Sequence, residues 1–196
     1  MRALSHLVDR ISRSLLLWAA ITVLALAVTA CSAFIANAGA VRVSGTAVYD
    51  VNPLASRADL EAAVRALAGP ARGSVTLFYT FDTVFPLLIG FSFAGAFAFG
   101  LRRLRPEAYE AGRFGSWILV PLVATLVDWA ENVCALWLTT AYPPVDQTAL
   151  TALVVVRWAK LVIMAVVAVC LAIGAAGLLA PRDRTAVSRT RPGARP

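Results

Sequence analysis

The sequence has few of the residues that build metal and nucleophilic sites. It contains one histidine, His6, and three cysteines that show none of the close spacing of metal-ligand pairs. A structural zinc site needs four such ligands, commonly paired at short spacing. The sequence therefore predicts no metal site, and we expect no bound cofactor.

Lysine is almost absent as well. Of 18 lysine and arginine residues, only Lys160 is a lysine. Charged residues make up 15% of the chain and hydrophobic residues 60%, with a mean hydropathy of +0.76. Soluble domains contain about 45–50% apolar residues. This composition indicates a membrane protein.

Four apolar runs are long enough to cross a bilayer, which takes about 20 helical residues. They cover residues 15–38, 74–101, 115–139 and 149–180. We therefore expect an all-α fold, an integral membrane four-helix bundle over residues 15–180. A short segment, 1–14, precedes it, and a basic tail, 181–196, is predicted to be disordered.

The arginines indicate the orientation of these spans. They cluster before the first span, between the second and third, and after the fourth, whereas the other loops contain as many acids as arginines. The positive-inside rule then places both termini in the cytoplasm, in a bacterial inner (cytoplasmic) membrane. Topology thus explains the high pI, about 10.2, without a nucleic-acid partner. Membrane lipid is the expected partner, and the arginine-rich tail would contact its anionic headgroups.

The first outer loop, residues 39–73, contains the pattern of a short amphipathic helix. Ser56 and Asp59 have the spacing of a helix cap, Leu60, Val64 and Leu67 share one face, and Gly69-Pro70 ends the pattern. This helix lies on the outer membrane surface, or covers the bundle as a lid, or only packs the loop down.

Small residues mark two helix faces, with Ser92, Ala96 and Gly100 on the second span and Gly174 and Gly177 on the fourth. Such residues allow close helix packing in lipid, and we expect them to pack the helices of one chain, with a homo-oligomer as the alternative.

Cys31 leaves three alternatives open. It follows Val28-Thr29-Ala30 in a loose lipoprotein-type pattern, and it lies at a depth similar to that of Cys134. It is therefore either lipidated, paired with Cys134, or a buried thiol, and we favour the last.

Ionisable residues inside the apolar runs are the strongest functional lead. Counting about 1.5 Å per helical residue from the cytoplasmic ends puts them all in the outer half of the membrane. Such residues are costly there and commonly pair or face a cavity. They are Asp82 of the second span, Asp128 and Glu131 of the third, and Arg157 and Lys160 of the fourth.

Their spacing places them on shared helix faces. Asp128, Glu131 and Asn132 stand at i, i+3 and i+4 of the third span. Pro86 lacks an N–H, so the backbone carbonyl of Asp82 loses its helical partner and becomes a free acceptor. The three acids and two bases sum to a formal charge of −1, which favours a shared proton, a cation or a cationic ligand group.

These elements resemble a group of small bacterial four-span membrane proteins to which no activity is assigned. The shared pattern is Asp-x-x-Phe-Pro at residues 82–86 and Asp-x-x-Glu-Asn at 128–132, followed by Tyr142-Pro143 and the lysine at 160. The chain departs from it at Arg72, which follows Ala71 in place of glycine, and at Ile89-Gly90, where an aromatic is expected. The resemblance covers about residues 60–160. It implies the four-span topology and the polar cluster, and no chemistry.

Three functions remain open. In the first, which we favour, the protein binds a lipid or small ligand in an outer-half cavity, or has a structural or partner role. Its ligand-binding residues would be Tyr79, Asp82, Asn132, Arg157 and Lys160. In the second, it is an intramembrane enzyme on a lipid-like substrate, with Asp128 or Glu131 as acid or base. Arg157 and Lys160 would hold an anionic group, and Asn132 would orient the substrate. In the third, the three acids form the relay of a proton- or cation-coupled transporter.

Overall fold

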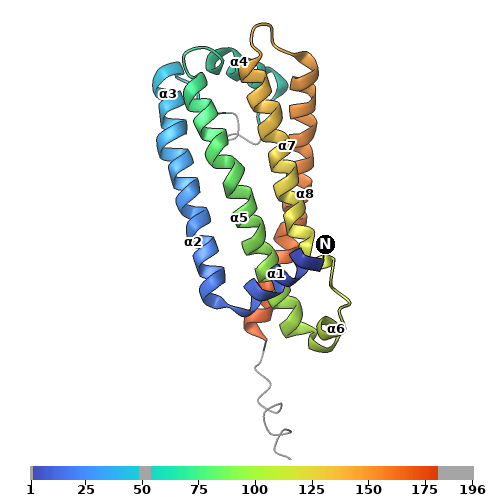
Figure 1. Cartoon of the computed structure of the whole chain (residues 1–196). Coiled ribbons are helices and arrows are strands. Elements are labelled where there is room, and N and C mark those ends of the chain that lie inside the picture. Colours follow the sequence, from blue (N-terminus) through green and yellow to red (C-terminus); the bar gives the residue numbers. More distant parts are fainter. Residues whose placement is uncertain (1, 49–53, 181–196) are drawn as a thin grey trace, which may run out of the picture.

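A computed structural model describes residues 2–48 and 54–180 of the chain, and within those ranges it is all-α. The basic tail, 181–196, lies outside the described residues. Figure 1 shows the helices in chain order. They are α1 (Arg2–Arg13), α2 (Leu15–Cys31), the π-helix η1 (Ser32–Asn37), α3 (Ala38–Ser44), α4 (Arg57–Leu67), α5 (Arg72–Leu104), α6 (Pro106–Glu110), the 3₁₀ turn η3 (Trp117–Leu119), α7 (Val120–Thr140) and α8 (Gln147–Leu179).

Four helical stretches are long and apolar enough to cross a membrane: Leu15–Ser44, Arg72–Leu104, Trp117–Thr140 and Gln147–Leu179. The prediction of an all-α bundle with four spans is confirmed. The first stretch runs six residues further than predicted, because α2, η1 and α3 form one continuous helix. It ends at Gly45, whose φ of 71° is the left-handed conformation in which glycine commonly ends a helix.

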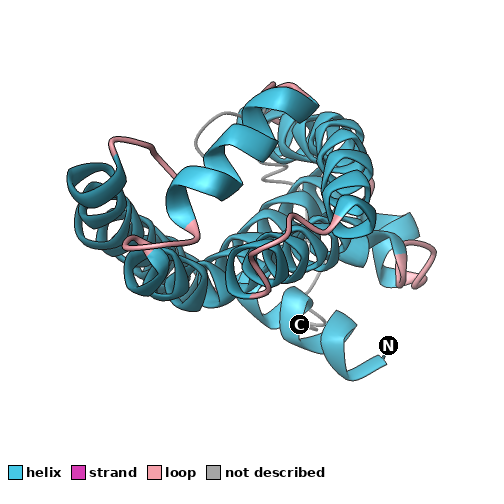
Figure 2. Cartoon of the chain, turned by 90° about the horizontal axis from the view of Figure 1, so that it is seen from above, coloured by secondary structure: helices cyan, strands magenta, loops and turns pink. Residues whose placement is uncertain are grey.

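The four long helices are unequally packed. Helices α5, α7 and α8 each pack against the other two, whereas α2 packs mainly against α5 (Figure 1). Helix α4 lies across one end of the bundle, which we call the α4 end (Figures 1 and 2). Helices α1 and α6 lie at the opposite end, the α1 end, together with the last described residues (Figure 1). Both ends of the described chain are therefore on the same side of the bundle.

Helix α4 covers the bundle as a lid. The Ser56 hydroxyl accepts a hydrogen bond from the N–H of Asp59, and the Asp59 carboxylate accepts one from the N–H of Ser56, which is the expected cap. Leu60, Val64 and Leu67 are at most 1% exposed and lie in one core with residues of α3, α5, α7 and α8. This confirms the amphipathic helix and identifies it as a lid.

Helix α1 is not predicted from the sequence, where residues 1–14 are expected only as a short segment before the first span. Val8 and Ile11 are buried, and α1 packs against α5. Asp9 accepts hydrogen bonds from Nε of Arg13 and from the hydroxyl of Tyr109, both at 2.8 Å. Burial, and then this bond to Asp9, raises the pKa of Tyr109 to about 12. The sequence signal for this helix was the spacing of Leu4, Val8 and Ile11, at i, i+4 and i+7.

The glycines of α5 and α8 bring these two helices into backbone contact. A Cβ added at Gly100 would lie 2.3 Å from the carbonyl oxygen of Ile173, and one added at Gly177 would lie 2.6 Å from Cα of Gly100. The small-residue faces therefore pack two helices of the same chain, as expected from the sequence.

All three cysteines lie in the described ranges and have free thiols. The alternative of a disulfide between Cys31 and Cys134 therefore does not hold in this structure. Cys134 instead packs against the core beneath the lid.

We expect Gly100→Ala to lower the free energy of unfolding by about 1–3 kcal/mol, since the obstructing atoms are backbone and cannot rotate away. Gly73→Ala is the matched control on the same helix, because an added Cβ there meets nothing within 4 Å. Thermal unfolding in detergent measures both. Equal effects of the two substitutions would contradict the close packing of α5 on α8.

The lid should respond to pH through Asp59. Hydrogen bonds from the hydroxyl and the N–H of Ser56 hold the pKa of this carboxyl below its ordinary value of 3.8. A lowered folded-state pKa stabilises the fold above the unfolded pKa, and that contribution is lost as the pH falls through the folded pKa. We expect the stability difference between wild type and Asp59→Ala to be full above pH 3.8 and to shrink below it. A difference that persists unchanged in strong acid would contradict this cap.

Candidate functional site

Pro86 of α5 creates the first part of the site. Because Pro86 has no N–H, the carbonyl of Asp82 needs another donor. The side-chain amide of Asn132, on α7, donates to it at 3.2 Å. The Asp82 carbonyl therefore accepts a hydrogen bond from outside its own helix, and α7 supplies the donor.

Two further side chains of α7 donate to neighbouring carbonyls of α5. The indole N–H of Trp129 donates to the carbonyl of Thr83 at 2.8 Å, and the hydroxyl of Thr125 donates to that of Pro86 at 2.7 Å. Together with Asn132 they form a ladder of three side-chain hydrogen bonds from one face of α7. Buried polar groups require such partners.

Gly90 leaves room for this ladder. A Cβ added there would lie 2.5 Å from the hydroxyl oxygen of Thr125, too close for any real contact. A larger residue at position 90 would push α7 away from α5. The sequence analysis missed Thr125 and Trp129, although their spacing from Asn132, at i−7 and i−3, was the available signal.

The second part of the site is an ion network between α7 and α8. The Nζ of Lys160 lies 2.5 Å from Oδ1 of Asp128 and 2.7 Å from Oε2 of Glu131. One turn earlier on α8, Nη1 of Arg157 lies 3.5 Å from Oε1 of Glu131. Both acids on this face of α7 therefore have basic partners on α8.

The network is not buried evenly. The side chains of Glu131 and Arg157 are 3% and 6% exposed, whereas those of Asp128 and Lys160 are 12% and 25% exposed. Long basic side chains commonly keep their charged end near a more polar region. The Lys160–Asp128 pair is thus the accessible end of the network, and Glu131 is its buried centre.

The other sequence-predicted residues lie close by on α5. Asp82 and Tyr79 are 6% and 3% exposed, and Tyr79 belongs to the core beneath the lid. Lys160 lies thirteen residues from the start of α8 and nineteen from its end, so the network is in the half of the bundle toward α4. The structure therefore brings the predicted residues together in one half of the bundle.

A small cavity adjoins this network at Arg157. It has a volume of about 70 Å³ and lies between α8 and the residues that lead into the lid. Its lining consists of Leu54, Ala55, Leu60, Val154, Arg157, Trp158 and Leu161. A larger cavity, about 310 Å³, lies at the α1 end, away from the ion network. Across the described ranges, no group of three histidine, cysteine or acidic side chains is placed to hold a metal ion.

Comparisons of the chain with protein-family models, with curated proteins and with solved structures found no match. The resemblance to small bacterial four-span proteins therefore stays a prediction from the sequence.

We expect Asn132 and Pro86 to be energetically coupled. Asn132→Leu leaves the Asp82 carbonyl without its donor, at a cost of about 1–3 kcal/mol. Pro86→Ala provides an N–H that can bond to that carbonyl within the helix. In the Pro86→Ala background, Asn132→Leu should therefore cost about 1 kcal/mol less. Thermal unfolding of the two single variants and the double variant gives the coupling, and strictly additive costs would show that the amide does not replace the missing helical bond.

Proposed function

We propose that the protein is a multi-pass protein of the bacterial cytoplasmic membrane that binds a lipid-like molecule at Arg157. The observation that supports this most is the cavity between α8 and the lid, because it adjoins the buried ion network. The distribution of arginines supports an orientation with both termini in the cytoplasm. The cavity then lies in the outer half of the bilayer.

The chemistry of the lining favours a ligand with hydrogen-bond acceptors. The polar side chains in it are the Arg157 guanidinium and the Trp158 indole, and both groups only donate. The five ionisable groups already sum to −1, which disfavours a further anion. An uncharged ester or carbonyl oxygen satisfies both conditions.

The size of the cavity favours an amphiphile over a soluble metabolite. A volume of about 70 Å³ holds a few atoms, far below the ~300–1,000 Å³ of pockets that enclose a whole ligand. Trp158 is 64% exposed on the surface of α8, beside Val162 at 66%. The polar group of a lipid would enter the cavity while its chain lay along this apolar surface.

In this proposal the ion network has a supporting role. Lys160 and Arg157 together offset the two acids of α7, and the contact with Glu131 holds Arg157 beside the cavity. A purely structural or partner-binding role for the network is the outcome if no lipid binds.

The exposed end of the network supports a second candidate function, that of an enzyme. Asp128 and Lys160 are its most accessible charged side chains, and a carboxylate in apolar surroundings suits general acid or base work. In that case Asp128 or Glu131 would transfer the proton and Lys160 would hold the substrate. Asp128→Asn would then abolish turnover of a lipid ester without preventing its binding.

The binding proposal can be tested with monoolein, a single-chain glycerol ester, against 1-octadecene, which has an apolar chain and no acceptor. At about 100 times its Kd, a ligand raises the free energy of unfolding by about 2.7 kcal/mol. We expect monoolein, and not octadecene, to raise the unfolding temperature of the purified protein. Leu161→Phe, which fills the cavity, should remove the shift.

Ala159→Phe is the matched control, because Ala159 is exposed on α8 and does not line the cavity. It should keep the monoolein shift. If octadecene stabilises the protein as much as monoolein does, or if both phenylalanine variants lose the shift, the proposed site is wrong.

A further inference from the structure

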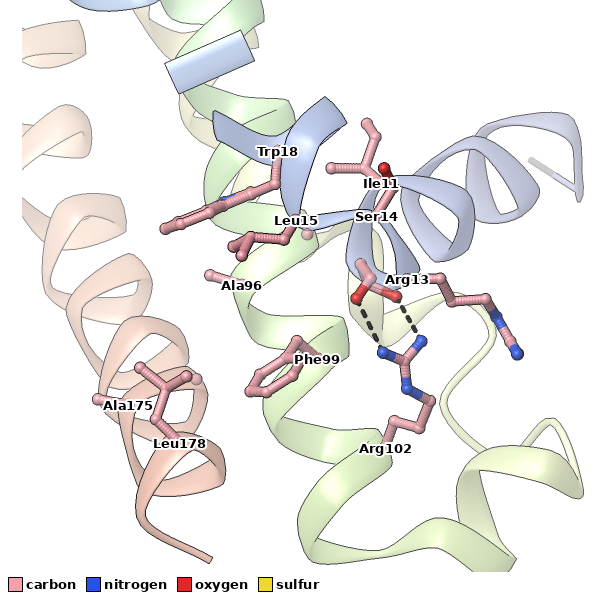
Figure 3. Close-up of a pocket in the computed structure, with 13 residues that line it drawn as sticks. Ile11, Arg13, Ser14, Leu15, Trp18, Ala96, Phe99, Arg102, Ala175 and Leu178 are labelled. Carbon is pink, nitrogen blue, oxygen red and sulfur yellow. Dashed lines mark hydrogen bonds between the residues drawn. The ribbon is translucent and has the colours of Figure 1, made fainter. Parts of the chain in front are cut away.

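The larger cavity is an apolar crevice between two spans that do not pack tightly on each other. Figure 3 shows α2 on one side with Leu15 and Trp18, α8 on the other with Ala175 and Leu178, and Phe99 of α5 between them. Its volume of about 310 Å³ reaches the lower limit of ordinary ligand pockets, ~300 Å³. Leu15 and Leu178 are 76% and 72% exposed, so the crevice faces the surroundings of the bundle.

The polar rim of the crevice is basic. Arg102 donates to the carbonyl oxygen and the hydroxyl of Ser12 at 2.8 and 3.0 Å (Figure 3), and its guanidinium carbon lies 5.9 Å from the ring centroid of Phe99. A guanidinium has five N–H donors, and Ser12 takes two of them. The structure thus holds Arg102 in place at the mouth of the crevice with donors to spare.

The rim lies where the apolar spans begin and end. The span of α2 starts at Leu15, directly after Ser14 of the rim, and that of α5 ends at Leu104, just beyond Arg102. The walls are within the spans and the rim is at their boundary. This is the depth at which a phospholipid changes from acyl chain to headgroup.

The whole α1 end has a positive net charge, like the rim of the crevice. Residues 1–14 and 102–116 contain seven arginines and three acids, whereas residues 39–73 and 141–148, toward the α4 end, contain four of each. Basic clusters beside membrane spans attract anionic lipid headgroups.

We propose that this crevice is a binding site for an anionic phospholipid of the leaflet on the α1 side. One acyl chain lies between Trp18 and Leu178 over Phe99, and the phosphate accepts hydrogen bonds from Arg102. This site is separate from the cavity at Arg157, and it differs in selecting a negative charge.

Two other occupants fit the rim less well. The tail, residues 181–196, contains five arginines and one acid, and a second copy of the chain would bring the same basic end to the contact. Neither has the negative charge that complements Arg102. An anionic lipid supplies both that charge and the apolar chain.

Native mass spectrometry of the purified full-length protein tests this with phosphatidylglycerol and phosphatidylcholine of identical acyl chains. Wild type should retain phosphatidylglycerol in preference to phosphatidylcholine. Ala175→Phe, which fills the crevice, should lower phosphatidylglycerol retention about tenfold, the effect of losing about two buried methylene groups.

Ala176→Phe is the matched control: Ala176 is also exposed on α8 but does not line the crevice. It should retain phosphatidylglycerol as wild type does. The proposal is overturned if wild type shows no headgroup preference, if both variants retain equal amounts, or if a second copy occupies the crevice and the protein is a dimer without lipid.

Trp18 offers a second test should Ala175→Phe fail to fold. The fluorescence of Trp18 is obtained as the difference between wild type and Trp18→Phe. Phosphatidylglycerol brominated on its acyl chain should quench this fluorescence, and brominated phosphatidylcholine should quench it less. Equal quenching by the two lipids would overturn the proposal.

Discussion

The structure depends on the pairing of charges that its apolar helices bury. A lone carboxylate or ammonium at membrane depth is costly, and this chain places three acids and two bases there. Lys160 compensates much of the buried negative charge, because its ammonium contacts both Asp128 and Glu131. That contact fixes the register of α8 on α7. Such pairs seldom add much net stability, yet breaking one leaves an uncompensated buried charge.

The same constraint explains why α5, α7 and α8 form the centre of the bundle. Pro86 frees a carbonyl on α5, and Asn132 satisfies it from the helix that also carries the acids. Close backbone contact at Gly100 and Gly174 then holds α5 on α8 at the α1 end. Helix α2 contains no acidic or basic residue and packs mainly on α5, which leaves the crevice between α2 and α8.

The sequence was sufficient for features whose signals are local. Apolar run length predicted the four spans, the Ser56–Asp59 spacing predicted α4, and Pro86 predicted the free carbonyl of Asp82. The close packing of α5 on α8 was also expected, from their small residues, whereas other contacts between helices were missed. The donors to α5 and the crevice at Arg102 depend on which faces of different helices meet. Helix α1 was missed although Leu4, Val8 and Ile11 have the same spacing as the apolar residues of α4, because its burial depends on packing against α5.

The most direct test of the central role of Lys160 is a thermal-unfolding cycle of Lys160→Met, Asp128→Asn and the double variant in nanodiscs. If the pair is required by the buried charge, Lys160→Met alone should cost about 3–5 kcal/mol, since it leaves two acids facing one arginine. Asp128→Asn should then restore much of that loss in the double variant. Additive effects, or a Lys160→Met variant as stable as wild type, would show that the fold does not depend on this contact.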